Sequence, residues 1–341
     1  MIVSHMFRRA PLLALATGFA FAAGVGSPQP ARADAGSTTA STFTFANADG
    51  GNVFVYRWLP AGPPKATVMI VHGLAEHAGR YDRFARALNA AGYAVFAADN
   101  RGHGKTAPPG HLGDGGPDAW NGTERDLAQL AGIIRSQGPA PLFIFGHSLG
   151  SAFTQRFIEL HGSGLSGAIL SGTFGVVPNL PAVVAQIDAG AAGAGALQKT
   201  IAPTLFATYN KPFENRTGFE WLSRDPAEVD RYVHDPLCGF AVTNQYVAAM
   251  FHGFADTWDP ANEALIPVTL PVLMMGGDAD PVGADTVSVK ALADRYDAHG
   301  LKDLHVTFYP GGRHEMLNET NRDAVTADVI AWLNEHLPKG S

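Results

Sequence analysis

The residues with the clearest chemical potential lie in the stretch LFIFGHSLGSAF, residues 142–153, where Ser148 stands between Gly146 and Gly150. An apolar run precedes this G-x-S-x-G pattern, and a helix-forming segment follows it. A strand that passes into a helix through such residues holds the serine in a tight, strained turn at the helix N-terminus, where the dipole favours negative charge. The glycines are needed because a Cβ at either position would collide with a neighbouring strand or helix. The pattern predicts that Ser148 is the nucleophile of an acyl transfer.

A serine hydroxyl becomes a good nucleophile only when a base removes its proton, and the base needs an orienting acid. With a nucleophile of this kind, the chain order is serine, acid, histidine, and the histidine follows the last strand. His314, in YPGGRHEM, is the best placed of the 13 histidines, and GGDADPV offers Asp278 and Asp280 as the acid. The histidines expected on helices or in the insertion are interpreted as surface or structural residues: His161, His234, His252, His299 and His336.

Alternating apolar runs and amphipathic segments predict the elements that position these residues. Strands are expected at residues 42–46, 53–58, 66–73, 93–99, 141–146, 166–172, 270–277 and 304–311. Helices are expected at residues 81–91, 120–136, 149–160, 284–299 and 322–336. The first two strands suit an antiparallel hairpin, and the later, wholly apolar ones suit a parallel sheet buried on both faces. The chain is therefore predicted to form an α/β fold with a mostly parallel central sheet flanked by helices.

Residues 174–267 interrupt this alternation and predict a mostly helical cap, inserted between core segments 34–173 and 268–341. The cap is rich in aromatic residues: Phe206, Tyr209, Phe213, Phe219, Trp221, Tyr232, Phe240, Tyr246, Phe251, Phe254 and Trp258. Each could belong to the core of the cap or to the wall of a binding pocket. As a set they favour an apolar substrate.

The first 33 residues have the features of a cleaved signal peptide. Arg8 and Arg9 precede an apolar stretch, residues 11–26, and PARA ends at Ala33 with a small-x-small cleavage pattern. The stretch is short for a membrane-spanning anchor, which is the alternative interpretation. We expect an exported, periplasmic or secreted chain that begins near Asp34, and both the Sec and the twin-arginine route stay open.

Five ordered motifs carry a resemblance to a known family: HGLAEHAGRY, DNRGHGKT, GHSLGS, GGDADPV and YPGGRHEMLNE. Together they resemble the monoacylglycerol lipase and lysophospholipase branch of the α/β-hydrolases, of the serine aminopeptidase S33 type, over about residues 42–338. The resemblance implies an α/β-hydrolase fold with a helical cap. In that family the acid ends a G-x-x-D pattern followed by proline and an aliphatic residue. This favours Asp280 over Asp278, which is then interpreted as a turn-capping residue.

The same resemblance implies further site residues. The oxyanion of the tetrahedral intermediate needs two backbone N–H donors. The first is expected at Leu149, directly after the nucleophile, and the family pattern places the second at Leu74. In relatives that cleave monoglycerides, the Glu and Arg of EHAGRY line the polar end of the pocket. The matching Glu76 and Arg80 are candidates for substrate binding or for a structural ion pair.

Charge and motif content narrow the partners. The chain has a net charge of −7, and because the leader holds three arginines and no acids, its removal leaves −10. Such a chain is not expected to bind nucleic acid, and at most transient contact with a lipid surface is expected. Neither a metal-binding H-E-x-x-H nor a P-loop occurs, so no metal or cofactor is expected. The expected partner is a small ester or lipid, and the protein is expected to be a monomer or homodimer.

The sequence therefore predicts a serine hydrolase that cleaves carboxylic esters of apolar acyl groups, of the monoacylglycerol or lysophospholipid type. A peptidase of the proline iminopeptidase type would use the same triad but needs acids in the cap, for which Glu214, Glu220 and Glu228 are candidates. An esterase for short-chain or environmental esters is a second alternative. A binding protein that has kept only the fold is the third.

Overall fold

The computed structural model describes residues 40–200 and 207–338 of the 341-residue chain. The predicted signal peptide, residues 1–33, lies outside the described residues. Within the described ranges no helix has the length and apolar character needed to cross a membrane.

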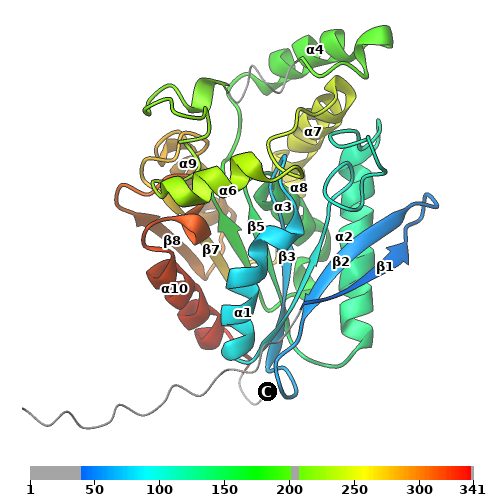
Figure 1. The fold of residues 1–341 in the computed structure, drawn as a ribbon. Coiled ribbons are helices and arrows are strands. Elements are labelled where there is room, and N and C mark those ends of the chain that lie inside the picture. Colours follow the sequence, from blue (N-terminus) through cyan, green and yellow to red (C-terminus); the bar gives the residue numbers. More distant parts are fainter. Residues whose placement is uncertain (1–39, 201–206, 339–341) are drawn as a thin grey trace, which may run out of the picture. The chain divides into compact units, whose positions relative to one another are not determined.

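The described strands form one eight-stranded sheet in the order β1-β2-β4-β3-β5-β6-β7-β8 (Figure 1). β1 and β2 pair in antiparallel orientation, and so do β2 and β4. From β4 to β8 in this order, neighbouring strands pair in parallel orientation. The strands are β1 (Ser41–Ala46), β2 (Asn52–Trp58), β3 (Ala66–Val71), β4 (Tyr93–Ala98), β5 (Leu142–His147), β6 (Gly167–Ser171), β7 (Val272–Gly277) and β8 (Leu304–Tyr309). The predicted α/β fold and its amino-terminal hairpin are confirmed.

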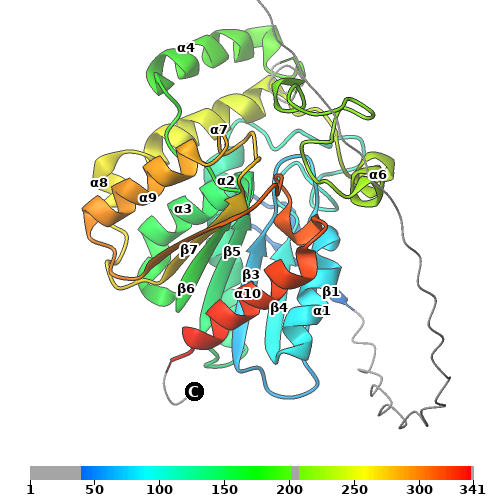
Figure 2. The same cartoon turned by 90° about the vertical axis from the view of Figure 1, so that its left-hand side faces the viewer.

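Helices cover both faces of this sheet, which explains why its central strands are apolar throughout (Figure 2). One face carries α1 (Asp82–Ala90) and α10 (Arg322–Glu335), and the other carries α2 (Ala119–Ser136), α3 (Leu149–His161) and α9 (Val287–His299). Phe145 of β5 packs with the first group and its neighbour Ile144 with the second, because successive strand residues point to opposite faces. Short 3-10 helices lie at η1 (Ala78–Tyr81), η2 (Gly162–Gly164) and η4 (Met316–Asn318).

Between β6 and β7 the described residues form helices and no strand. These helices are α4 (Leu180–Ala191), η3 (Gly193–Gly195), α6 (Pro226–His234), α7 (Asn244–Thr257) and α8 (Pro260–Glu263). Figures 1 and 2 show α4, α6 and α7 gathered beyond the end of the sheet where the parallel strands finish. This is the end of the sheet at which ligands bind in open α/β folds.

Aromatic residues of α7 fasten the cap to the core. The ring of Trp120 on α2 stacks on Phe153 of α3 with 4.3 Å between centroids, and Phe254 meets Trp120 edge-on at 5.5 Å. Trp258, which follows α7, donates its indole N–H to Gln155 Oε1 at 2.9 Å. These cap aromatics therefore act as core residues, and the expected Phe206 lies outside the described residues.

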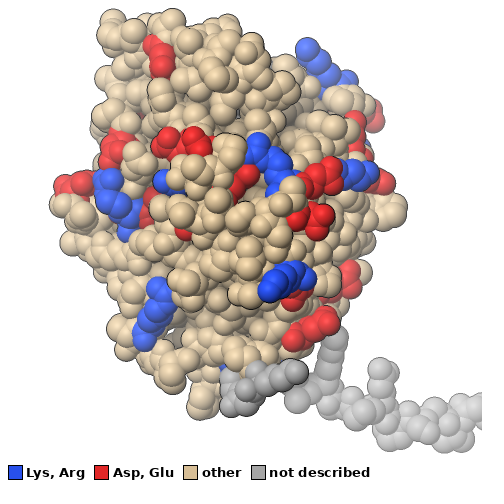
Figure 3. Space-filling view, turned by 180° about the vertical axis from the view of Figure 1, so that it is seen from behind, with Lys and Arg blue, Asp and Glu red and all other residues tan. Residues whose placement is uncertain are grey.

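Acidic and basic side chains alternate over one face of the molecule, without a broad basic area on that face (Figure 3). A surface of this kind lacks the concentrated positive field that a polyanion requires.

The contact between α7 and α2 predicts a large effect of one methyl group. A Cβ at Gly253 would overlap the Trp120 ring, so Gly253→Ala must separate the two helices. We expect a loss of about 2 kcal/mol in the free energy of unfolding, measured by chemical denaturation. Gly132→Ala on α2 is the matched control, because a Cβ there meets nothing within 4 Å and alanine favours the helix. Equal stability of the two variants would contradict the proposed contact.

Candidate active site

Ser148 occupies a strained turn between β5 and α3. Its backbone has φ 53° and ψ −122°, an unusual conformation for a residue other than glycine. A Cβ at Gly146 would collide with Gly150 and Thr154 of α3, and a Cβ at Gly150 would collide with the backbone of Val71 and His72. The two glycines thus let α3 approach both β5 and the end of β3, which fixes the position of the serine.

Asp280 and His314 meet although they come from different loops, after β7 and after β8. His314 Nδ1 lies 2.9 Å from Asp280 Oδ2, and both side chains are buried. Asp280 Oδ1 accepts the N–H of Val282 at 2.9 Å, which fixes the orientation of the carboxylate. Asp278 has a different partner, because its Oδ1 accepts the N–H of Gly311 at 2.6 Å.

The second nitrogen of His314 is available for chemistry. Nε2 is buried and has no hydrogen-bond partner among the described residues. With Nδ1–H donated to Asp280, Nε2 carries the lone pair and can accept a proton. Burial on its own lowers the pKa of His314, but the charge of Asp280, its hydrogen bond to the ring and the nearby charges of Glu315 and Glu76 together outweigh burial, and the net shift is upward from 6.5. The ring therefore combines a free lone pair with raised basicity.

Ser148 and His314 line a common cavity of about 310 Å³, together with Leu74, Trp221 and other residues of core and cap. Ser148 also lines a second cavity of about 550 Å³ whose wall is almost wholly apolar. That wall is formed by Leu74, Leu149, Phe174, Val176, Val177, Val183, Trp221, Met250, Phe251 and Phe254, among others. Cap aromatics therefore also serve as cavity wall, as the sequence allowed.

The two amides expected to form an oxyanion hole lie beside Ser148. Leu74 and Leu149 both line the apolar cavity with the serine. Leu149 is the first residue of α3, where a backbone N–H has no acceptor within its helix. In the described chain, the N–H of Leu74 also has no acceptor. Both N–H groups thus lack an acceptor among the residues that the structure describes.

A buried hydrogen-bond network holds the loop that carries Leu74. His103 Nε2 accepts the N–H of Ala75 at 3.1 Å, and Asp99 Oδ1 accepts that of Ala78 at 2.8 Å. His72 Nε2 accepts the N–H of Asn100 at 2.9 Å. Burial lowers the pKa of His103 to about 4 and that of His72 to about 3, so both rings are neutral near pH 7 and can act as acceptors. Residues of the DNRGHGKT motif therefore brace the loop that carries Leu74.

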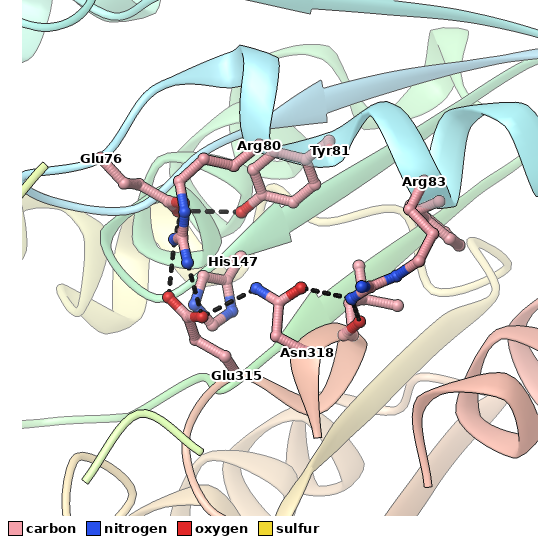
Figure 4. A pocket seen from close by; sticks show the side chains of 9 residues that line it. Glu76, Arg80, Tyr81, Arg83, His147, Glu315 and Asn318 are labelled. Atoms are coloured by element: carbon pink, nitrogen blue, oxygen red, sulfur yellow. Dashed lines mark hydrogen bonds and ion pairs between the residues drawn. The ribbon is translucent and has the colours of Figure 1, made fainter. Parts of the chain in front are cut away.

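Glu76 and Arg80 form a buried ion network that also contains Glu315 (Figure 4). Arg80 donates to Glu76 at 2.6 Å and to both oxygens of Glu315 at 2.7 and 2.8 Å. Gly73 N–H and Tyr81 O–H both donate to the other oxygen of Glu76, at 2.6 and 2.9 Å. Arg80 thus directs three of its N–H groups to these two carboxylates, and Glu76 and Glu315 also line the cavity of Ser148 and His314.

Sequence patterns did not point to Glu315 or to residues 221–224, which we call the cap strap. Glu315 directly follows His314, and only the fold shows that its side chain reaches Arg80. The strap is bonded to the histidine loop, since His314 N–H donates to Trp221 O at 3.2 Å and Glu315 N–H to Leu222 O at 2.8 Å. Buried Glu319 accepts the N–H of Arg224 and that of Arg313, at 2.9 and 3.0 Å. In the sequence, the second acidic residue of RHEMLNE, Glu319, was the signal that could have pointed to this contact between the strap and the histidine loop.

In the described chain, two groups of side chains could hold a metal ion, and neither includes a residue that lines these two cavities. The candidate site brings together a serine, a buried His–Asp pair and backbone amides. Such a set is suited to nucleophilic attack on a carbonyl carbon and stabilisation of the resulting oxyanion.

Comparison with known proteins agrees with this geometry. The model of the family "serine aminopeptidase, S33" matches residues 62–321, which is more than half of the chain. A monoacylglycerol lipase of Mycolicibacterium smegmatis is 30% identical over 310 residues, covering 88% of this chain and 99% of the relative. A monoglyceride lipase of Mus musculus is 28% identical and covers 85% and 89%. The crystal structure of a thermostable carboxyl esterase from Bacillus coagulans with glycerol has a TM-score of 0.81 at 30% identity, covering 88% and 99%.

The network of Figure 4 predicts that Arg80 is needed for stability. Arg80→Ala leaves two buried carboxylates without their cation, so we expect the free energy of unfolding to fall by about 3–5 kcal/mol. Arg86→Ala is the matched control, because Arg86 forms an exposed i,i+4 pair with Asp82 that contributes about 0–1 kcal/mol. Chemical denaturation compares the two variants. An Arg80→Ala protein as stable as the control would assign Arg80 to substrate binding alone.

Proposed function

The chain belongs to the serine aminopeptidase S33 family and is a carboxylic ester hydrolase of the α/β-hydrolase fold, and from this premise we propose that it cleaves esters of apolar acyl groups, of the monoacylglycerol or lysophospholipid type, with a Ser148–His314–Asp280 triad. The observation that supports the triad most strongly is the state of His314. Its Nδ1 is bound to Asp280, and its unpartnered Nε2 belongs to a ring that shares a cavity with Ser148.

In the first step, His314 Nε2 takes the proton of Ser148 as Oγ attacks the ester carbonyl. The negative charge on the carbonyl oxygen is stabilised by the N–H groups of Leu74 and Leu149, each worth about 3 kcal/mol in the transition state. Asp280 keeps the imidazole in the required tautomer and stabilises the imidazolium. When the tetrahedral intermediate collapses, His314 gives the proton to the leaving alcohol, and an acyl-Ser148 remains.

In the second step, water attacks the acyl-enzyme. His314 Nε2 takes a proton from the water, and the same two amides hold the oxyanion. Collapse returns the proton to Ser148 and releases the carboxylic acid. His314 acts as the general base and then as the general acid in both steps.

The two cavities at Ser148 support the proposed substrate class. The apolar cavity of about 550 Å³ suits an acyl chain, because burial of methylene groups is favourable by about 0.8 kcal/mol each. The smaller cavity includes Glu76 and Glu315, whose carboxylates can accept hydrogen bonds from hydroxyl groups of an alcohol moiety. The similar monoacylglycerol lipase and the glycerol-bound esterase are consistent with this division.

The peptidase alternative receives less support from the cap. An aminopeptidase needs an acid near the nucleophile to bind the substrate's ammonium group. Neither cavity at Ser148 is lined by Glu214, Glu220 or Glu228. Glu220 accepts hydrogen bonds from Thr217 and Asn210, and Glu228 pairs with Arg83 and Arg231. Glu76 and Glu315 do lie there, but Arg80 neutralises part of their charge.

Ester hydrolysis by the purified chain tests the proposal directly. We expect turnover of p-nitrophenyl esters, 1-monoacylglycerol and lysophosphatidylcholine, with a preference for medium or long acyl chains over acetate. Ser148→Ala should lower kcat by on the order of 10⁶-fold because the nucleophile is lost. A preference for acetate would favour the short-chain esterase, and cleavage of amino-acid amides alone would favour the peptidase. No turnover of any of these substrates would favour a binding protein.

The two aspartates of GGDADPV provide a matched pair for the acid. Asp280→Asn should lower kcat by about 10⁴-fold, because the amide favours the wrong tautomer of His314. Asp278→Asn should change kcat little, since an amide oxygen can still accept the N–H of Gly311. Equal losses of kcat in Asp280→Asn and Asp278→Asn would refute the assignment of Asp280.

For the wild type, kcat/KM should fall as the pH drops through the raised pKa of His314, because the protonated ring cannot accept the serine proton.

A further inference from the structure

A group of three potential metal ligands lies at the amino ends of the parallel strands, whereas Ser148 lies at their carboxyl ends. Asp303 immediately precedes β8, His305 lies on β8, and His336 directly follows α10. One ligand atom of each residue lies within 4.8 Å of those of the other two. The group is independent of the proposed hydrolase function, because Asp280 and His314 follow the carboxyl ends of β7 and β8, whereas Asp303 lies at the amino end of β8.

The carboxylate of Asp303 lies between two imidazoles. His305 Nε2 is 3.0 Å from Asp303 Oδ1, and His336 Nε2 is 3.2 Å from Asp303 Oδ2. The two imidazole rings meet nearly edge-on with 5.9 Å between centroids. One acid and two histidines therefore converge from a loop, a strand and a helix end.

The hydrogen bond of the other His336 nitrogen orients the ring so that Nε2 faces Asp303. His336 Nδ1 lies 2.7 Å from the carbonyl oxygen of Trp332, which can only accept, so Nδ1 carries the hydrogen. Nε2 then points at an oxygen of Asp303, where it can bond to the carboxylate through a proton or share a metal cation with it. Donation of one ring N–H to a backbone carbonyl is the arrangement by which metal-binding histidines are oriented.

We propose that Asp303, His305 and His336 form a zinc-binding site. Zinc binds imidazole nitrogen and carboxylate oxygen at about 2.0–2.2 Å in tetrahedral geometry, so neighbouring ligand atoms are about 3.3 Å apart. The two imidazole nitrogens lie 3.0 and 3.2 Å from Oδ1 and Oδ2 of the same carboxylate, respectively, and one ligand atom of each residue lies within 4.8 Å of the other two. Three protein ligands with water in the fourth position complete the coordination. The partial exposure of Asp303 and His305 leaves an entry path for the ion.

The surroundings hold two of the ligands in place. The His336 ring lies 4.3 Å from the Trp332 ring, centroid to centroid, and its side chain is only 9% exposed. The backbone carbonyl of Asp303 accepts the N–H of Val272, which anchors Asp303 beside β7. A bound ion would therefore connect the end of α10 to β8, which has a strand partner on one side only. The expected role is stabilisation of this edge.

The other group that could hold a metal has the opposite hydrogen-bond pattern. It consists of His77, Asp235 and Cys238. His77 Nδ1 accepts the N–H of Gly79 at 3.2 Å, so Nε2 carries the hydrogen and donates it to Asp235 at 3.0 Å. No lone pair of that ring is left for an ion. The hydrogen bonds thus select the site at Asp303.

Zinc titration of the purified chain tests the proposal. The chain should carry no histidine tag and should be freed of metal with a chelator before calorimetric titration with ZnCl₂. We expect one Zn²⁺ per chain and a higher Tm in its presence. His305→Ala and His336→Ala should each weaken the affinity at least about tenfold and remove the Tm increase. His305 is half exposed, so its variant tests binding even if loss of His336 destabilises α10.

His252→Ala is the matched control, because His252 forms a similar exposed pair with Asp188 at 2.9 Å but has no second imidazole in its group. This variant and His77→Ala should bind zinc like the wild type. The proposal is wrong if the wild type binds no zinc, if both His305→Ala and His336→Ala keep full affinity, or if His77→Ala abolishes binding.

Discussion

The close approach of α3 to β3 and β5 is the constraint on which the site depends. It leaves no room for a Cβ at Gly146 or Gly150 and holds Ser148 at positive φ. The parallel strands then bring the loops after β3, β7 and β8 to the same edge, because parallel strands end together. Leu74 and the Asp280–His314 pair lie at the same end of the sheet as Ser148 for that reason. Sheet topology and two missing side chains thus position groups that lie far apart in the sequence.

The buried charges around the candidate site are paired. Arg80 lies between Glu76 and Glu315, and the Asp280 carboxylate is bound by His314 and a backbone amide. Unpaired, such groups would carry a desolvation cost of several kcal/mol each. The pairing permits a polar cavity and an apolar cavity to meet at Ser148. An ester that joins an apolar acyl chain to a polar alcohol has the same division.

The cap and the catalytic core are joined by hydrogen bonds as well as by aromatic packing. The backbone of the cap strap, residues 221–224, is hydrogen-bonded to the backbone of His314 and Glu315. Glu319 accepts hydrogen bonds from the backbone and the side chain of Arg224. Tyr232 of α6 donates to the carbonyl of Ala75, next to the oxyanion loop. The cap therefore contacts both the loop with His314 and the loop that carries Leu74. Changes in the cap sequence can thus alter the geometry of the site as well as the substrate pocket.

Periodicity and motif order determined the fold, because the wholly apolar strand runs and the strand-turn-helix at Ser148 are local signals. They also indicated His314 and narrowed the acid to two aspartates, of which the family resemblance favoured Asp280. Only the tertiary structure placed Asp280, and not Asp278, against the imidazole, since the choice depends on how the loop after β7 turns toward β8. The tertiary structure also paired Glu315 with Arg80. It brought Asp303 and His305 close to His336, which follows them in the chain after α10. Contacts between residues distant in the chain leave no spacing pattern in the sequence, because the sheet and its covering helices, rather than the local chain, set their separation.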